Sequence, residues 1–313
     1  MSVLHVSGMT KSYRPSLGQL VDKETRAVRY GIFDINFSIA RGEVYGLLGL
    51  EGAGKTTLIR SILGLVRPNS GKVTFLGRKN LRFLNTILKN AGYMPQEYGF
   101  YEDFSGVQFL KFMSAGRKVD PGFRNNLTES LGLDKDTLRT RVWEYTPVMQ
   151  QKLVLVAAMQ HNPPFLALDE PTYQMIMPEK QAFYRLMDAF TAGGGAVLLA
   201  TVSAAEAETI CSRIALMDKG KIIAEETPES LRRKAVYNFA VHMDPAPDSR
   251  FFKQTGASPP QQGGNSLHFQ AAGNISLLLS KLQEAGRIKA LDLERAPLED
   301  TMSRFYTKED LHA

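Results

Sequence analysis

Residues 44–57 read Val44-Tyr45-Gly46-Leu47-Leu48-Gly49-Leu50-Glu51-Gly52-Ala53-Gly54-Lys55-Thr56-Thr57. The pattern predicts a short buried strand, a glycine-rich loop and the start of a helix. Within it, Gly49-x4-Gly54-Lys55-Thr56 has the spacing of a phosphate-binding P-loop. The alternative is a glycine-rich turn that carries Gly-Lys-Thr by chance. The P-loop is favoured because an amphipathic helical pattern follows at once, at Ile59, Ile62, Leu63 and Val66.

The residue types of this loop suit the chemistry of a phosphate chain. Backbone N–H groups can wrap phosphates only where no Cβ intervenes, which explains Gly49, Gly52 and Gly54. Lys55 would bring a positive charge to the terminal phosphates, and the Thr56 hydroxyl would ligate Mg²⁺. The positive end of the following helix would face the same phosphates. We therefore expect a nucleotide site.

The bulk composition describes an ordinary globular protein. With 313 residues, 43% hydrophobic and 22% charged, the chain can form one large domain and a smaller one. Its net charge of +6 fits the cytoplasmic face of an anionic membrane, nucleic acid, or an average soluble surface. Cys211 is the only cysteine, which suits a reducing compartment. We expect no signal peptide and no membrane span, so another chain would cross any membrane that this one serves.

Strand and helix patterns alternate along the first part of the chain. Strands are expected at 3–11, 33–39, 44–48, 72–76, near 92–94, at 165–170 and at 196–201. Residues 14–27 are interpreted as a loop or short helical insert, 102–160 as a helical subdomain and 179–190 as a helix. Such alternation around a P-loop predicts a mostly parallel α/β sheet.

The pattern changes near residue 228, so we expect a nucleotide-binding domain at 1–227 and an accessory α/β domain at 228–313. The second would hold a basic helix at 228–234, a strand at 236–241, a loop at 245–265 and a strand at 267–269. A helix at 275–285, a strand at 288–293 and a last helix at 298–305 would complete it.

Asp169 and Glu170 close the buried strand that begins at Phe165. One carboxylate could hold the hydration shell of Mg²⁺, while its neighbour orients and polarises an attacking water. An Asp-Glu pair at a strand end can equally be solvated surface. The P-loop upstream favours the functional interpretation.

At this point the chain resembles the ATP-binding subunits of ABC transporters. Residues 49–57 are similar to the family's Walker A motif, Leu166–Thr172 to its Walker B and Gly92–Gln96 to its Q-loop. The resemblance implies ATP and Mg²⁺ as ligands, with Glu170 catalytic and with Thr56, Gln96 and Asp169 at the metal. It assigns nucleotide contacts to Gly49, Glu51, Gly52, Ala53, Gly54, Lys55, Thr56, Thr57, Gln96 and Tyr13. Tyr13 would stack on adenine, although a plain strand-end tyrosine is an open alternative.

The same resemblance implies the fold and the partners. The fold would be that of a P-loop NTPase: a mostly parallel core sheet, an antiparallel β subdomain and a helical subdomain. The tail resembles that of ABC-2-type exporters, whose ATPase subunits pair on integral membrane permease subunits. This places the chain peripherally, at the cytoplasmic face of the cell membrane, with no nucleic acid as partner. The transported substrate leaves no trace in the sequence.

Three family motifs are altered. The signature aligns with Tyr145-Thr146-Pro147-Val148-Met149, where Pro147 has no N–H to donate and Val148 adds a branched Cβ. Val202 stands at the switch-histidine position, and residues 173–177 lack the expected Asp. We expect slow or asymmetric hydrolysis, and a heterodimer with a second ABC ATPase subunit is favoured over a homodimer. Thr146 and Pro147 still suit a helix start.

Two other functions are considered. A soluble regulatory or assembly ABC protein would use ATP to gate dimerisation without transport. A P-loop kinase or GTPase is disfavoured by the Q-loop-like and Walker B-like segments. Residues 98–104 are aromatic and acidic, as a surface receiving a membrane subunit's helix would be, although a packed loop is equally open.

Overall fold

The fold comes from a computed structural model that describes residues 2–13, 31–79, 87, 89–101, 103–247, 249–263, 266–273, 275–302 and 305. The chain divides into two compact units, Met1–Glu225 and Glu226–Ala313, described here one at a time. The division lies two residues before the boundary expected from the sequence. None of the helices among the described residues is both long and apolar enough to cross a bilayer.

A six-stranded sheet forms the centre of the first unit, in the order β10-β9-β3-β8-β7-β6. β3 pairs in parallel with both β8 and β9, and β6, β7 and β8 are also parallel to one another. Every residue of β3, β7 and β8 is buried, as expected for strands covered on both faces. The bounds are β3 Val44–Leu48, β6 Ala91–Met94, β7 Phe165–Asp169, β8 Ala196–Thr201, β9 Arg213–Asp218 and β10 Lys221–Glu226.

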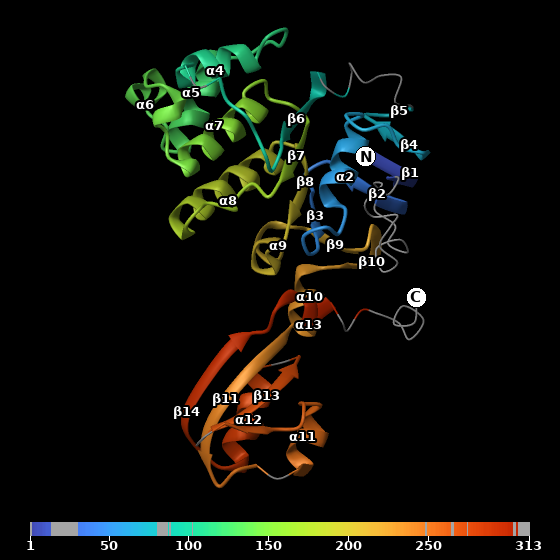
Figure 1. The fold of residues 1–313 in the computed structure, drawn as a ribbon, viewed down its shortest axis with the longest axis vertical. Coiled ribbons are helices and arrows are strands. Elements are labelled where there is room, and N and C mark those ends of the chain that lie inside the picture. The colour runs from blue at the N-terminus through green and yellow to red at the C-terminus, as the bar shows by residue number, and fades with distance from the viewer. Residues whose placement is uncertain are drawn as a thin grey trace, which may run out of the picture. The chain divides into compact units, whose positions relative to one another are not determined.

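A second sheet in this unit has the order β2-β1-β4-β5 and is antiparallel throughout. Its strands are β1 Ser2–Ser12, β2 Gly31–Ala40, β4 Ser70–Phe75 and β5 Arg78–Lys79. Helix α2 (Lys55–Ile62) lies between the two sheets, and its buried Leu58, Ile59 and Ile62 join side chains of both in one core (Figure 1). The helix ends at Ile62, whereas the amphipathic pattern in the sequence continues through Leu63 to Val66.

Helices occupy most of the described residues in the segment 102–160, where the sequence predicts a helical subdomain. It contains α4 (Gly106–Met113), α5 (Pro121–Ser130), α6 (Lys135–Arg139), the 3₁₀ turn Val142–Glu144 and α7 (Pro147–Met159). Ser105, Asp120 and Asp134 cap the first three helices through their side-chain oxygens. Two further helices, α8 (Met177–Ala192) and α9 (Ala204–Ile210), follow β7 and β8.

The second unit has its own antiparallel sheet, in the order β12-β13-β11-β14. The stacked rings of Phe239 and Phe269, with centroids 5.0 Å apart, lie at the centre of its core, and Phe252 meets Phe269 edge-on. The strands are β11 Val236–Asp244, β12 Gln261–Gly263, β13 Ser266–Ala272 and β14 Arg287–Arg295. The helices are α10 Pro228–Lys234, α11 Ser249–Thr255, α12 Ile275–Ala285 and α13 Leu298–Met302.

One sequence-based expectation in this unit is wrong. Residues 245–265 are not simply a loop, because they contain α11 and β12. Phe251 and Phe252 of α11 are buried in the core, so tertiary packing stabilises a helix that the surrounding Pro, Gly and Gln residues concealed. The loop or insert expected at 14–27 lies outside the described residues, as do residues 303 and 304 of the helix expected at 298–305.

Candidate nucleotide-binding site

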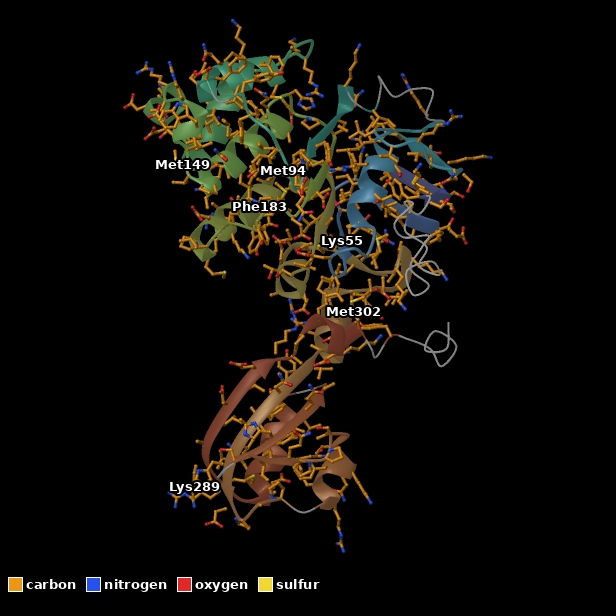
Figure 2. All side chains as sticks on the ribbon, in the orientation of Figure 1. Lys55, Met94, Met149, Phe183, Lys289 and Met302 are labelled. Carbon is orange, nitrogen blue, oxygen red and sulfur yellow. The ribbon has the colours of Figure 1, made fainter. Side chains whose placement is uncertain are left out.

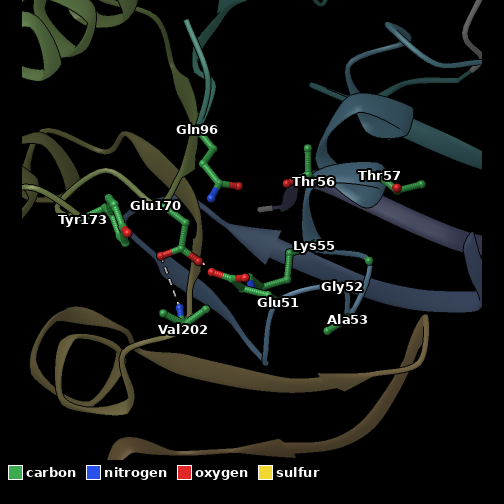
Figure 3. A pocket seen from close by; sticks show the side chains of 11 residues that line it. Glu51, Gly52, Ala53, Lys55, Thr56, Thr57, Gln96, Glu170, Tyr173 and Val202 are labelled. Carbon is green, nitrogen blue, oxygen red and sulfur yellow. Dashed lines mark hydrogen bonds and ion pairs between the residues drawn. The ribbon is translucent and has the colours of Figure 1, made fainter.

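A pocket of about 290 Å³ opens at the P-loop (Figure 3). Its walls come from the loop between β3 and α2 and from the segments that follow β6, β7 and β8. These are the carboxyl ends of neighbouring parallel strands, where ligands bind in open α/β sheets. The lining residues are Glu51, Gly52, Ala53, Gly54, Lys55, Thr56, Thr57, Gln96, Glu170, Tyr173 and Val202.

The glycines of the loop are required by its geometry at two positions. A Cβ on Gly49 would lie 2.2 Å from the carbonyl oxygen of Met217, so the backbone of β9 leaves no room for a side chain. Gly54 caps α2 with a φ of 102°, a conformation that other residues rarely adopt. The turn can therefore point backbone N–H groups into the pocket at the start of α2.

Lys55, labelled in Figures 2 and 3, lies at the floor of the pocket. Its Nζ donates hydrogen bonds to the carbonyl oxygens of Gly49 (2.7 Å) and Leu50 (3.1 Å). The same atom lies 3.5 Å from Oε1 of Glu170, and both side chains are buried. Burial lowers the pKa of Lys55, while the Glu170 carboxylate opposes that shift. The ammonium group is thus pre-positioned beside the loop that would hold phosphates.

Glu170 follows β7 directly and has a φ of 51°, in the left-handed region. Its backbone N–H donates to the carbonyl oxygen of Ala200 (2.9 Å), and its Oε2 accepts from the Val202 N–H (3.3 Å). Burial raises the pKa of the Glu170 carboxyl, and the Lys55 charge partly opposes the rise. A carboxylate with a raised pKa is a stronger base toward a water molecule.

Asp169 is only 1% exposed, yet neither of its carboxylate oxygens has a hydrogen-bond partner among the described residues. Burial raises the pKa of Asp169, and the nearby Thr56 hydroxyl and Lys55 charge lower it. Buried carboxylate oxygens without partners are costly unless something binds them. The described residues hold no cluster of three or more His, Cys, Asp or Glu side chains suited to a metal. The oxygens of Asp169 and Thr56 fit Mg²⁺, which takes few protein ligands and keeps several waters.

The structure brings most of the predicted site residues together. Nine of them line the pocket: Glu51, Gly52, Ala53, Gly54, Lys55, Thr56, Thr57, Gln96 and Glu170. Gly49 and Asp169 are not lining residues; Gly49 accepts the hydrogen bond from Lys55, and Asp169 is buried. Figure 3 shows Gln96 and Glu170 directed toward the P-loop from the opposite wall.

Tyr13 does not belong to the pocket lining in the described part of the chain. The residue is 44% exposed, and its ring centroid lies 5.1 Å from Nζ of Lys11. Its stacking on adenine stays a prediction.

The sequence interpretation did not single out Tyr173, which lines the pocket although it is 71% exposed. Its position directly after the Walker B-like segment was the available signal. Val202 also lines the pocket, and it acts on Glu170 through its backbone N–H rather than its side chain.

The altered signature region begins helix α7. Thr146 is the N-cap, its hydroxyl accepts from the Met149 N–H (3.3 Å), and Pro147 is the first helical residue. The predicted helix start is therefore confirmed. Thr146 and Pro147 are exposed, so the helix tip presents a hydroxyl and a proline ring to solvent in this chain.

Comparisons with known proteins identify the family. The model of the ABC transporter family matches residues 32–173. The daunorubicin resistance ATP-binding protein DrrA3 of Streptomyces coeruleorubidus is 33% identical over 214 residues, covering 65% of this chain and 67% of that protein. The Nod factor export ATP-binding protein I of Rhizobium leguminosarum bv. viciae is 30% identical over 233 residues, covering 73% of this chain and 70% of that protein.

A third relative is longer than this chain. The probable multidrug ABC transporter ATP-binding protein YbhF of Escherichia coli is 31% identical over 207 residues, which cover 64% of this chain and 35% of that protein. The alignment therefore spans about a third of YbhF.

Solved structures show the same fold. An ATP-binding subunit of an ABC transporter superposes with a TM-score of 0.64 at 25% identity, covering 74% of this chain and 92% of that one. A dimeric bacterial ABC transporter cassette gives a TM-score of 0.60 at 19% identity, covering 72% of this chain and 98% of that one. By this shared fold and by its similarity to DrrA3 and to the Nod factor export protein, the chain belongs to the ATP-binding proteins of the ABC transporter family.

Proposed function

We propose that this chain binds ATP with Mg²⁺ in the P-loop pocket and hydrolyses it as the ATPase subunit of an ABC-2-like exporter. The observation that supports this most directly is the placement of Glu170. Its buried carboxylate lies against both the Lys55 ammonium and the Val202 N–H, and it lines the same pocket as the P-loop.

The residues of the nucleotide site have distinct roles in this proposal. The backbone N–H groups of the loop and the Lys55 ammonium bind the phosphates, with Lys55 moving from the carbonyl oxygens of Gly49 and Leu50. Glu170 orients a water and accepts its proton at a carboxylate oxygen. When bound, Mg²⁺ would neutralise negative charge on the phosphates. Asp169, Thr56 and Gln96 are the residues that would hold it. Tyr13 is proposed to contact the adenine.

The test is steady-state ATP hydrolysis by the full chain with its membrane subunits. Glu170→Gln should lower kcat at least about 100-fold and leave nucleotide affinity within about threefold, since it removes the base but not the phosphate contacts. Glu206→Gln is the control, because the buried Glu206 accepts a hydrogen bond from Thr172 (2.5 Å) outside the pocket lining. Equal loss in both variants, or hydrolysis unaffected by Glu170→Gln, would contradict the assignment.

The altered motifs lead us to propose slow or asymmetric turnover. Pro147 offers no N–H and Val148 carries a branched side chain at the start of α7, where family members donate to the γ-phosphate of a partner's ATP. A heterodimer with an ABC chain of intact signature would complete the site on this chain's P-loop. Replacing Pro147 and Val148 together by Gly should raise ATPase activity of the complex; unchanged activity would count against it.

The aromatic segment after the Q-loop is proposed as the contact surface for a permease helix. The rings of Tyr101, Phe104 and Phe112 form a cluster with centroids 5.0–5.9 Å apart. Tyr101 is 58% and Phe112 is 49% exposed, which is a solvation cost that a membrane subunit would relieve. Such docking would place the chain peripherally at the cytoplasmic face of the membrane.

The double variant Tyr101→Ala with Phe112→Ala should weaken binding to the permease subunits at least about tenfold while ATP binding is retained. Leu65→Ala is the control, since Leu65 is 50% exposed and lies outside the cluster.

Native mass spectrometry of the purified complex would count its subunits. Two different ABC chains on two permeases support the heterodimer, two copies of this chain contradict it, and a complex without permease would favour a soluble regulator instead.

A further inference from the structure

We infer that Gln151 is a positioning residue for Glu170, an inference that rests on the proposed hydrolytic role of Glu170. Gln151 lies on α7 and is only 3% exposed. Its Nε2 donates a hydrogen bond of 3.3 Å to the backbone carbonyl oxygen of Glu170, in the interior of the first unit. Through this bond, the helix that starts at the altered signature contacts the peptide group of the proposed base.

The backbone of Glu170 needs such support because of its conformation. A φ of 51° is unfavourable for a residue with a side chain, so the surroundings must stabilise it. Four hydrogen bonds do so. The Glu170 N–H donates to the carbonyl oxygen of Ala200 (2.9 Å), and its Oε2 accepts from the Val202 N–H (3.3 Å). Its carbonyl oxygen accepts from both the Tyr173 N–H (3.3 Å) and Nε2 of Gln151 (3.3 Å). Of these four partners, Gln151 alone comes from the helical subdomain.

The polarity of Gln151 is unusual for its place in the helix. The buried residues that follow it, Leu153 to Met159, are all apolar. Its Oε1 has no hydrogen-bond partner among the described residues, so the amide is only half satisfied in the interior. A methionine would pack there without this cost. The amide therefore fits a role at Glu170 better than a role in packing.

Gln160, the C-cap of the same helix, provides a matched control. It is 1% exposed, its Nε2 donates to the carbonyl oxygen of Leu110 (3.0 Å), and its Oε1 also lacks a partner in the described part of the chain. Gln160 thus has the same chemistry as Gln151, but its contact is with α4 instead of Glu170. Gln151→Met and Gln160→Met should lower the melting temperature by comparable amounts.

The two variants should differ in kinetics, measured on the full chain with its membrane subunits. Gln151→Met should lower kcat about 5- to 30-fold, with KM and ATP affinity within about twofold, because the phosphate contacts stay intact. Gln160→Met should keep kcat within about twofold. Unchanged kcat in Gln151→Met, or an equal loss in Gln160→Met, would overturn the inference. In a Glu170→Gln background, Gln151→Met should lower kcat no further, whereas a second full loss would show an independent role.

A readout independent of hydrolysis separates this inference from the proposed function. Hydrogen exchange of the Val202 amide reports its bond to Oε2 of Glu170. That exchange should accelerate at least about fivefold in Gln151→Met and stay unchanged in Gln160→Met. Unchanged exchange in Gln151→Met overturns the positioning role. If Gln151→Met accelerates this exchange but the wild-type protein hydrolyses no ATP, the proposed function is overturned and the positioning role stands.

Discussion

Lys55 and Glu170 form an ion pair across the pocket floor, with Nζ 3.5 Å from Oε1 and both side chains less than a tenth exposed. The cation from the P-loop and the carboxylate after β7 thus neutralise each other before any nucleotide binds. Entry of a phosphate group would draw Lys55 toward a stronger anion and leave Glu170 freer to contact a water.

Removal of either partner of this pair should therefore have unequal effects on stability. Lys55→Met leaves Glu170 buried without its cation, whereas Glu170→Gln leaves Lys55 bonded to two carbonyl oxygens. We expect Lys55→Met to lower the free energy of unfolding by about 1–3 kcal/mol more than Glu170→Gln at pH 7. Urea unfolding of the two variants without nucleotide measures this. A larger loss in Glu170→Gln would contradict the account.

The glycines at 49 and 52 should tolerate alanine differently. A Cβ at Gly49 would meet the Met217 carbonyl oxygen at 2.2 Å, whereas at Gly52 it would meet nothing within 4 Å, although φ is 79°. Gly52→Ala therefore costs only the left-handed conformation, about 1–2 kcal/mol. Gly49→Ala should cost more, about 3 kcal/mol or above, because a strand must shift. Denaturant midpoints of both variants, at unchanged m-value, check the order; equal midpoints would contradict it.

His161 should make the protein less stable in mild acid. Its ring nitrogens are buried, and burial, with the nearby Arg117 charge, lowers its pKa from 6.5 to about 4. The unfolded state then binds the proton more readily between pH 4 and 6.5, so stability falls as pH falls through that window. Wild type should lose on the order of 2 kcal/mol relative to His161→Phe between pH 7 and 4.5.

The measurement for His161 is the unfolding free energy of both proteins at several pH values. The comparison with His161→Phe removes the contributions of other titrating groups. A constant difference between the two proteins across the window would show that the imidazole does not titrate differently on folding.

The stacked pair Phe239 and Phe269 should stabilise the second unit. Phe269→Ala removes a ring that contacts both Phe239 (5.0 Å) and Phe252 (5.3 Å), at a cost of about 3–5 kcal/mol. Leu291→Ala on β14 is the control, because Leu291 is 39% exposed, and it should cost less than about 1 kcal/mol. Calorimetry of the full chain, with transitions assigned to each unit, tests this; similar shifts in both variants would contradict it.

Much of the nucleotide site could be predicted because its motifs are local in sequence. Nine consecutive residues, 49–57, specify both the loop geometry and the ligand chemistry. The fully apolar run of β7 likewise predicted a strand buried on both faces, with Asp169 and Glu170 at its carboxyl end.

What could not be predicted depends on contacts between distant segments. The hydrogen bond between Gln151 and Glu170 joins the helical subdomain to the segment that follows β7, and no rule of residue spacing predicts it. The left-handed φ of Glu170 is stabilised by hydrogen bonds to distant segments, and the sequence does not indicate it, since glutamate rarely adopts this conformation. Helix α11 was missed because it is stabilised by two buried phenylalanines rather than by its own propensity.

The position of β3 in its sheet has a consequence for synthesis of the chain. Its two neighbours, β8 and β9, are both encoded far downstream, and β9 ends about 170 residues after β3 does. At about 5–20 residues per second, the ribosome needs roughly 10–35 s to deliver them. Until β8 is synthesised the nascent P-loop strand has neither of its partners, and until β9 follows it has only one. The nucleotide site is therefore one of the last parts of the first unit to form, and premature chain termination before β9 would yield a protein with both Walker sequences but an unfinished ATP site.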